Sequence, residues 1–203
     1  MGFYFFYLVQ LATGLLAIFS YKKYASSFFK YFIFYIFCSF ISGIFMSIYI
    51  NDSNNWSWFI FYEFIEFNSV ALMYYHLSKE ELTIKTIKYV SIGFNGFYLV
   101  GIFFAVLQSF IPILLGILVS VFFFLYLREL LNSSRIFIFR TDITFWITIG
   151  FLTFYLVSIP FLILLFVFDL KDKIIFHIFQ TILTVTHLTF IIGLLCSKTT
   201  VKS

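Results

Sequence analysis

The chain has 203 residues, of which 63% are apolar and only 11% are charged. With a mean hydropathy of +1.05, this composition lies outside the range of water-soluble globular proteins and excludes a soluble enzyme. The formal net charge of +4 comes from thirteen Lys and Arg residues scattered over short loops, so no basic patch indicates a nucleic-acid-binding protein. We therefore expect membrane lipid, and no nucleic acid, to contact this protein.

Seven apolar segments are long enough to cross a membrane. A bilayer core about 30 Å thick needs about 20 residues of apolar helix. Cutting the chain at each polar cluster leaves segments at residues 3–20, 28–50, 56–77, 86–107, 110–128, 143–168 and 174–196. Short loops use almost everything else, so no second domain is expected. We predict an all-α fold in which residues 1–203 form one seven-helix transmembrane bundle.

The distribution of basic residues predicts the orientation of this bundle. If the segments alternate in direction, one side of the membrane receives all but two of the thirteen basic residues. That side holds Lys22, Lys23, Lys30, Lys79, Lys85, Lys88, Arg128, Arg135, Arg140, Lys198 and Lys202. The opposite side holds only Lys171 and Lys173. Because positively charged loops stay in the cytoplasm, we predict an outside amino terminus and a cytoplasmic carboxyl terminus.

Two local patterns predict how the helices pack and where one of them begins. Small residues at helical spacing let helices approach closely in lipid, and Ser39, Gly43 and Ser47 form such a stripe in the second segment. The fourth segment carries a looser series, Gly93, Gly96, Gly101 and Ala105. Glu81 and Lys85 are four residues apart, which indicates that the loop before the fourth segment extends that helix.

Glu63 and Glu66 are the outstanding polar residues of the third segment. Counted from its start, they lie about 10 and 15 Å deep, and their spacing of three places them on adjacent parts of one helix face. A carboxyl group that faced lipid at this depth would be strongly unfavourable. We therefore expect both glutamates to face the interior of the bundle.

The seventh segment carries a matching polar seam, His177, Gln180, Thr184 and His187. The spacing of these residues confines them to one side of a helix. Because their levels overlap those of Glu63 and Glu66, we predict that the third and seventh segments face a shared cavity or a hydrogen-bonded core. Polar residues inside a membrane can also serve only to join helices, so the seam is either a functional site or a structural contact.

The sequence contains no recognisable catalytic, metal or cofactor motif, which weighs against an enzyme. His177 and His187 are about 15 Å apart along one helix, too far to share a zinc ion. Lys198 lies at the inner end of the seventh segment, so no buried lysine is placed to hold a retinal. The two cysteines, Cys38 and Cys196, form no metal-binding pattern. We therefore predict neither a metal nor a cofactor.

Two short patterns stand out in the third and sixth segments. The third segment carries an aromatic-Glu-Phe pattern in residues 62–65, Tyr-Glu-Phe-Ile. The sixth carries Phe145, Trp146, Ile147, Gly150 and Tyr155. These patterns, the second more strongly, resemble those of a family of short, uncharacterised seven-helix proteins of the bacterial inner membrane. The family often has a proline two residues before the Phe, where this chain has Ile143. The resemblance implies a compact inner-membrane bundle and no particular activity.

Together these features favour a small sensory, receptor-like or complex-forming membrane component. Its partners are expected to be lipid and either another protein or further copies of itself, because a basic cytoplasmic face suits protein partners or anionic lipid. The alternative is a proton- or small-solute-coupled transporter that uses the polar residues of the third and seventh segments.

Overall fold

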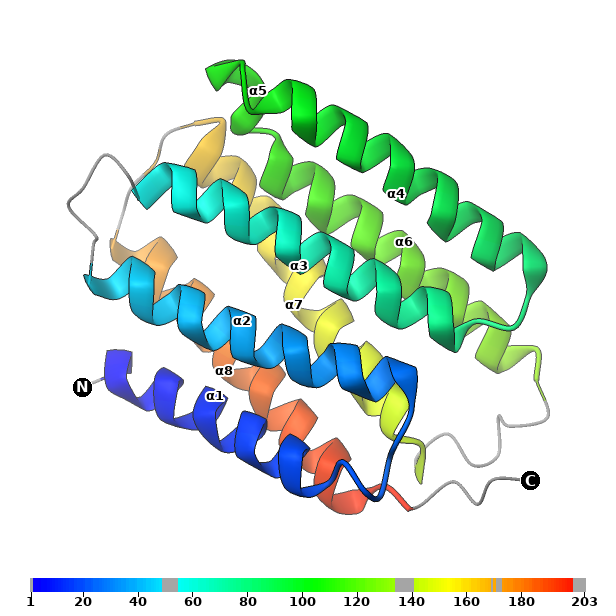
Figure 1. Cartoon of the computed structure of the whole chain (residues 1–203). Coiled ribbons are helices and arrows are strands. Elements are labelled where there is room, and N and C mark those ends of the chain that lie inside the picture. Colours follow the sequence, from blue (N-terminus) through cyan, green and yellow to red (C-terminus); the bar gives the residue numbers. More distant parts are fainter. Residues whose placement is uncertain (1, 49–54, 134–140, 169, 171–172, 199–203) are drawn as a thin grey trace.

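The computed structural model describes residues 2–48, 55–133, 141–168, 170 and 173–198. All regular structure in these ranges is helical, which confirms the predicted all-α class, and Figure 1 shows the helices side by side in one bundle. In chain order they are α1 (Gly2–Phe19), α2 (Ser27–Ile48), α3 (Asn55–Leu77), α4 (Glu81–Gly101), α5 (Ala105–Gln108), α6 (Ile111–Leu131), α7 (Ile143–Phe166) and α8 (Lys173–Cys196). Except for the single-turn α5, each helix overlaps one predicted segment.

The fourth predicted segment, residues 86–107, differs most from the structure. Its helix begins earlier, at Glu81, where the carboxylate pairs with Lys85 Nζ at 2.7 Å across one turn. It also ends earlier, at Gly101, and the chain turns before α5. The Gln108 side chain closes this turn by donating a hydrogen bond to the Ile102 carbonyl at 2.8 Å. Ala105 therefore belongs to α5 rather than to the long helix.

In the described part of the chain, four helical stretches are long and apolar enough to cross a membrane. They are Ser27–Phe45, Val106–Leu131, Ile143–Phe166 and His177–Cys196, and α1 adds a shorter apolar stretch, Phe5–Phe19. Large apolar side chains also cover the outside of the bundle; Phe19 is 80% exposed and Phe103 is 82% exposed. Such a surface is unfavourable in water, and it is compatible with a protein that inserts into a membrane.

Six of the long helices form a closed ring. Going round it, α1 packs on α2, α2 on α3, α3 on α6, α6 on α7, α7 on α8, and α8 again on α1. α4 lies outside this ring against α3 and α6 (Figure 1). Polar contacts hold it on α3: a reciprocal pair of amide hydrogen bonds joins Asn68 and Asn95 at 3.1 and 3.0 Å, and the Tyr98 hydroxyl donates to the Ile60 carbonyl at 3.3 Å.

Aromatic rings fill the centre of the ring of helices. Phe151 is fully buried, and its ring centroid lies 4.9 Å from that of Tyr35, 5.6 Å from that of Phe123 and 5.0 Å from that of Phe190. Tyr74, in the same layer, satisfies its buried hydroxyl with a 2.7 Å hydrogen bond to Thr148. This layer closes one half of the bundle interior, so any internal space must lie towards the other half.

Glycines decide how closely particular helices approach. At Gly43 an added Cβ would lie 3.0 Å from the Tyr7 ring, and the Tyr7 hydroxyl donates to the Gly43 carbonyl at 2.8 Å. This face of α2 therefore packs on a neighbouring helix as predicted, although the Ser47 side chain is outside the described residues. In the fourth segment the prediction is wrong for Gly93 and Gly96, where an added Cβ would meet nothing within 4 Å, but at Gly101 an added Cβ would lie 3.2 Å from Ile111. Gly93 and Gly96 lie on the side of α4 that faces away from the ring.

Candidate functional site

A cavity lies inside the ring of six helices, and every helix of the ring contributes to its wall. Its volume is about 160 Å³. The polar part of the wall consists of Tyr35, Ser39, Ser42, Tyr62, Glu63, Glu66, Tyr155 and Ser158. The apolar part consists of Phe6, Gly43, Phe59, Pro112, Leu115, Phe154, Leu162, Phe179 and Leu183. Since α4 contributes nothing, the ring itself encloses the site.

Glu66 is the most strongly bound polar group in the wall. The Tyr35 hydroxyl of α2 donates to Glu66 Oε1 at 3.3 Å, and the Tyr155 hydroxyl of α7 donates to the same oxygen. The Tyr62 hydroxyl also lies beside this carboxyl group. Because the side chain is only 6% exposed, these phenols take the place of water as hydrogen-bond donors. Glu66 thereby links three helices at the level of the cavity.

Glu63 has a different environment, one helical turn away on the same face of α3. It is also only 6% exposed, and its electrostatic neighbours are Glu66 and the Tyr98 side chain. Among the described residues nothing donates a hydrogen bond to Glu63, and no Lys, Arg or His forms an ion pair with either carboxyl group. The wall therefore contains two acidic groups and no charge of opposite sign.

Two buried hydroxyl groups complete this polar wall. Ser42 is 2% exposed and Ser158 is 1% exposed, and both side chains line the cavity. Neither hydroxyl oxygen has a hydrogen-bond partner in the described part of the chain. Buried polar atoms are usually satisfied, so these two hydroxyls on the wall of one cavity are available to a polar molecule inside it.

The structure places the predicted polar seam of α8 differently from the two glutamates. Glu63 and Glu66 line the cavity, whereas none of His177, Gln180, Thr184 and His187 does. α8 does reach the same cavity, but through Phe179 and Leu183.

Each seam residue of α8 has surroundings of its own. His177 is exposed on the outside of the bundle. Thr184 is half-buried and donates a hydrogen bond to the Gln180 carbonyl of its own helix at 2.8 Å. His187 is 2% exposed, and its ring centroid lies 6.0 Å from that of Phe6 and 5.6 Å from that of Phe190. α8 packs mainly on α1 and α7. Its polar residues therefore do not face α3.

Sequence analysis missed the hydroxyl groups that α2 and α7 bring to the cavity. Tyr35, Ser39 and Ser42 follow one another at spacings of four and three, which is a polar face of a helix and was a detectable signal. Tyr155 and Ser158 form a shorter version of the same pattern in α7. Tyrosine and serine are common in apolar helices of this composition, so only the cavity distinguishes these residues from their many neighbours.

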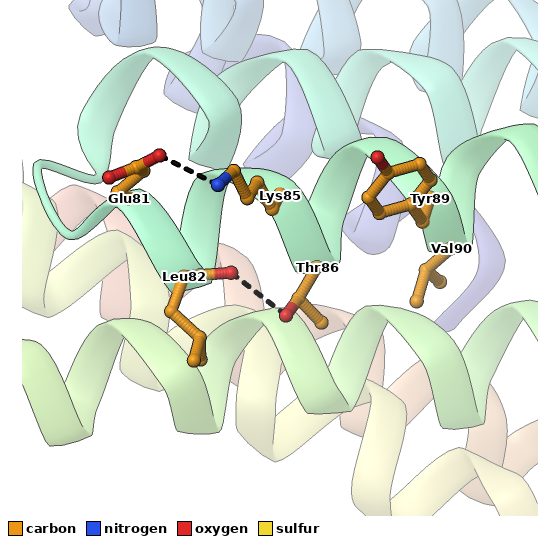
Figure 2. A pocket seen from close by; sticks show the side chains of 6 residues that line it. All are labelled: Glu81, Leu82, Lys85, Thr86, Tyr89 and Val90. Carbon is orange, nitrogen blue, oxygen red and sulfur yellow. Dashed lines mark hydrogen bonds and ion pairs between the residues drawn. The ribbon is translucent and has the colours of Figure 1, made fainter.

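A second, shallower depression lies along α4 and is not a comparable site. All of its lining residues belong to that one helix, as Figure 2 shows; they are Glu81, Leu82, Lys85, Thr86, Tyr89 and Val90. Glu81 already pairs with Lys85, and Thr86 donates to the Leu82 carbonyl at 2.9 Å. Nothing in this depression is both buried and unpartnered. Over the whole described chain, no group of three His, Cys, Asp or Glu side chains could hold a metal ion.

The fold and the cavity together define a class of protein: an all-helical bundle with helices that suit a membrane and a polar cavity at its centre. No family model, curated protein or solved structure matches this chain. Its function must therefore be argued from the cavity.

Proposed function

We propose that this protein is a seven-span component of the bacterial inner membrane, receptor-like or sensory, that binds a small ligand in the cavity of its helical ring. The amino terminus lies outside and the carboxyl terminus in the cytoplasm. In this orientation the cavity lies in the outer half of the membrane, because Glu63 is eight residues, or about 12 Å, along α3 from its outer end. The motifs in α3 and α7 make it a relative of the short inner-membrane proteins that they resemble.

The composition of the cavity wall supports this proposal. Six helices contribute to the wall, which contains two carboxyl groups and two hydroxyls without a hydrogen-bond partner. Unsatisfied polar groups in a membrane interior are unfavourable, so a ligand that pairs with the hydroxyls of Ser42 and Ser158 would stabilise this wall. The volume of about 160 Å³ is close to that of an engineered protein cavity that binds benzene, so the ligand is small. A ligand that binds at this depth contacts all six helices, and it can shift their relative packing as a receptor requires.

Ligand binding should be measurable as a gain in thermal stability. We expect the detergent-purified protein to show a saturable rise of its unfolding temperature with at least one member of a library of small polar molecules. Ser42→Leu fills part of the cavity and should abolish this rise. Thr181→Leu is the matched control, because Thr181 is an exposed residue of α8 outside the cavity. A library without any stabilising member, or a rise that persists in Ser42→Leu, would contradict the proposed binding site.

The orientation predicts which loops are reached from each side of the membrane. In a chain without its native cysteines, Ser53→Cys should react with a membrane-impermeant thiol reagent applied to the outside of intact cells. Ser134→Cys should react only after the cytoplasmic side is exposed, because it lies on the basic side. Labelling of both positions from one side would refute the alternation of spans. Such a result would also invalidate the depth assigned to the cavity.

A proton- or solute-coupled transporter is the second candidate, and the unpaired Glu63 in the cavity favours it. The two candidates make opposite predictions for reconstituted vesicles. Uptake that collapses in Glu66→Gln would establish transport. Ligand binding without uptake, together with co-purification of a stoichiometric partner protein or of the protein as a homo-oligomer, would establish the receptor-like component.

A further inference from the structure

The charge of the cavity wall indicates which ligand it holds. We propose that the cavity binds a small organic ammonium ion, whose positive charge lies against Glu63 and whose alkyl part contacts the aromatic wall. This inference rests on the proposed function, because it requires the cavity to be a ligand-binding site. It adds to that function the chemical class of the ligand.

The two carboxyl groups of the wall set its electrostatic preference. Glu63 and Glu66 are three residues apart in one helix, both are 6% exposed, and no basic residue of the described chain pairs with either. Glu66 accepts hydrogen bonds from Tyr35 and Tyr155, whereas Glu63 has no donor. A cation that binds beside such a group stabilises its carboxylate form, and the pair is held strongly because little water is present to screen it. An anionic ligand would find no positive charge in the described wall to pair with.

Such a ligand would also form hydrogen bonds with the wall. The unpartnered hydroxyl oxygens of Ser42 and Ser158 are acceptors in the same wall as Glu63. An ammonium group has three N–H donors, and a carboxylate and two hydroxyls are acceptors of the kind that it needs. The structure thus provides as many unused acceptors as one ammonium group requires. A neutral apolar molecule would leave all three polar groups unsatisfied.

The aromatic part of the wall favours an organic ammonium ion over a metal ion. Four phenylalanine and three tyrosine side chains line the cavity, and aromatic faces attract alkylammonium ions through cation–π contacts. A dehydrated metal ion would occupy only a small part of the volume of about 160 Å³. It would also require several oxygen ligands at about 2.0 to 2.6 Å. A cation that carries a small alkyl group fills more of the space. Its charge pairs with the polar part of the wall and its alkyl group contacts the apolar part.

The experiment compares probes of different charge on the full-length protein in nanodiscs of uncharged phosphatidylcholine at pH 7. The probes are tert-butylammonium chloride, neutral tert-butanol, anionic pivalate and sodium chloride, and calorimetry measures their affinities. Tert-butylammonium should bind at least about 30-fold more tightly than tert-butanol, the factor expected when a buried charge loses its partner. Glu63→Gln keeps the shape of the side chain and should weaken tert-butylammonium binding by about the same factor. Glu81→Gln, whose 82% exposed glutamate pairs with Lys85 on α4, should leave it unchanged.

The outcomes separate this inference from the proposed function. Equal affinity for tert-butanol or pivalate would show a ligand pocket without preference for positive charge, and sodium binding as tight as that of the ammonium ion would show an inorganic cation site. Either result overturns the ammonium inference and leaves the ligand-binding function intact. If no probe binds but the small-molecule library yields a ligand, again only this inference fails. If neither experiment finds a ligand, both proposals fail. If Glu63→Gln does not fold, the comparison of probes on the wild-type protein still tests whether the cavity prefers an ammonium ion.

Discussion

Gly193→Ala is expected to lower the free energy of unfolding by about 2 to 3 kcal/mol, the upper part of the range for overpacked interiors. An added Cβ at Gly193 would lie 2.5 Å from Trp146 Cβ. That atom is attached directly to the backbone of α7, so no side-chain rotation can move it away. The two helices must separate instead, and their contact is among the most extensive in the bundle. Titration of the purified protein with a denaturing detergent would measure the loss.

Gly93→Ala provides the matched control for this substitution. The added Cβ meets nothing within 4 Å, and replacing a helical glycine with alanine favours the helix by about 0.5 to 1 kcal/mol. The same change of residue should therefore destabilise the protein at one glycine and leave it unchanged or slightly more stable at the other. Equal effects at the two positions would mean that α7 and α8 do not approach as closely as the structure places them.

Glu66→Leu is expected to destabilise the bundle by about 2 kcal/mol, because it removes the acceptor shared by two buried phenols. Tyr35 and Tyr155 would each lose this acceptor and keep only neighbouring phenols as hydrogen-bond partners, which is unfavourable in a site that excludes water. Glu66→Gln keeps an oxygen acceptor and should lose less than half as much stability. Thermal unfolding in detergent would rank the two variants against the wild-type protein.

A combined variant tests the reason for this loss rather than its size. Tyr155→Phe should destabilise the wild-type protein, but in the Glu66→Leu background it should restore part of the lost stability, because it removes a donor that has lost its carboxyl acceptor. Additive losses would show that the two side chains do not interact. If Glu66→Leu alone left stability and ligand binding unchanged, Glu66 would not be an interior group.

Much of the secondary structure could be predicted from the sequence, because helix length in a membrane is set by bilayer thickness. The start of α3 at Asn55 and the end of α8 at Cys196 lie within a residue of the predicted limits. The prediction was least accurate around residues 101–107, where a continuous apolar run conceals a turn. The Gln108 side chain closes that turn on the Ile102 carbonyl, and Gly101 approaches Ile111 so closely that an added Cβ would lie 3.2 Å away; no hydropathy pattern encodes either feature.

The candidate site could be predicted only in part. Glu63 and Glu66 were identifiable because carboxyl groups deep in an apolar helix must face the interior. The residues that complete their site, Tyr155 and Ser158 above all, are 89 or more positions away in the chain and belong to an apolar helix whose rotation the sequence leaves open. For the same reason the polar face of α8 could be recognised from the sequence, but the helix against which it packs could not be predicted.

The sequence by itself determined that the chain forms apolar helices suited to lipid, how long they are, and that two glutamates belong inside. These properties depend on composition and on spacing within one helix, which are local. Only the tertiary structure decided that six helices close into a ring while α4 remains outside, and that Phe179 and Leu183, rather than the histidines of α8, reach the cavity. The order and rotation of the helices depend on packing contacts between side chains of different helices, such as that of Gly193 with Trp146. Such contacts leave no periodic pattern in the sequence.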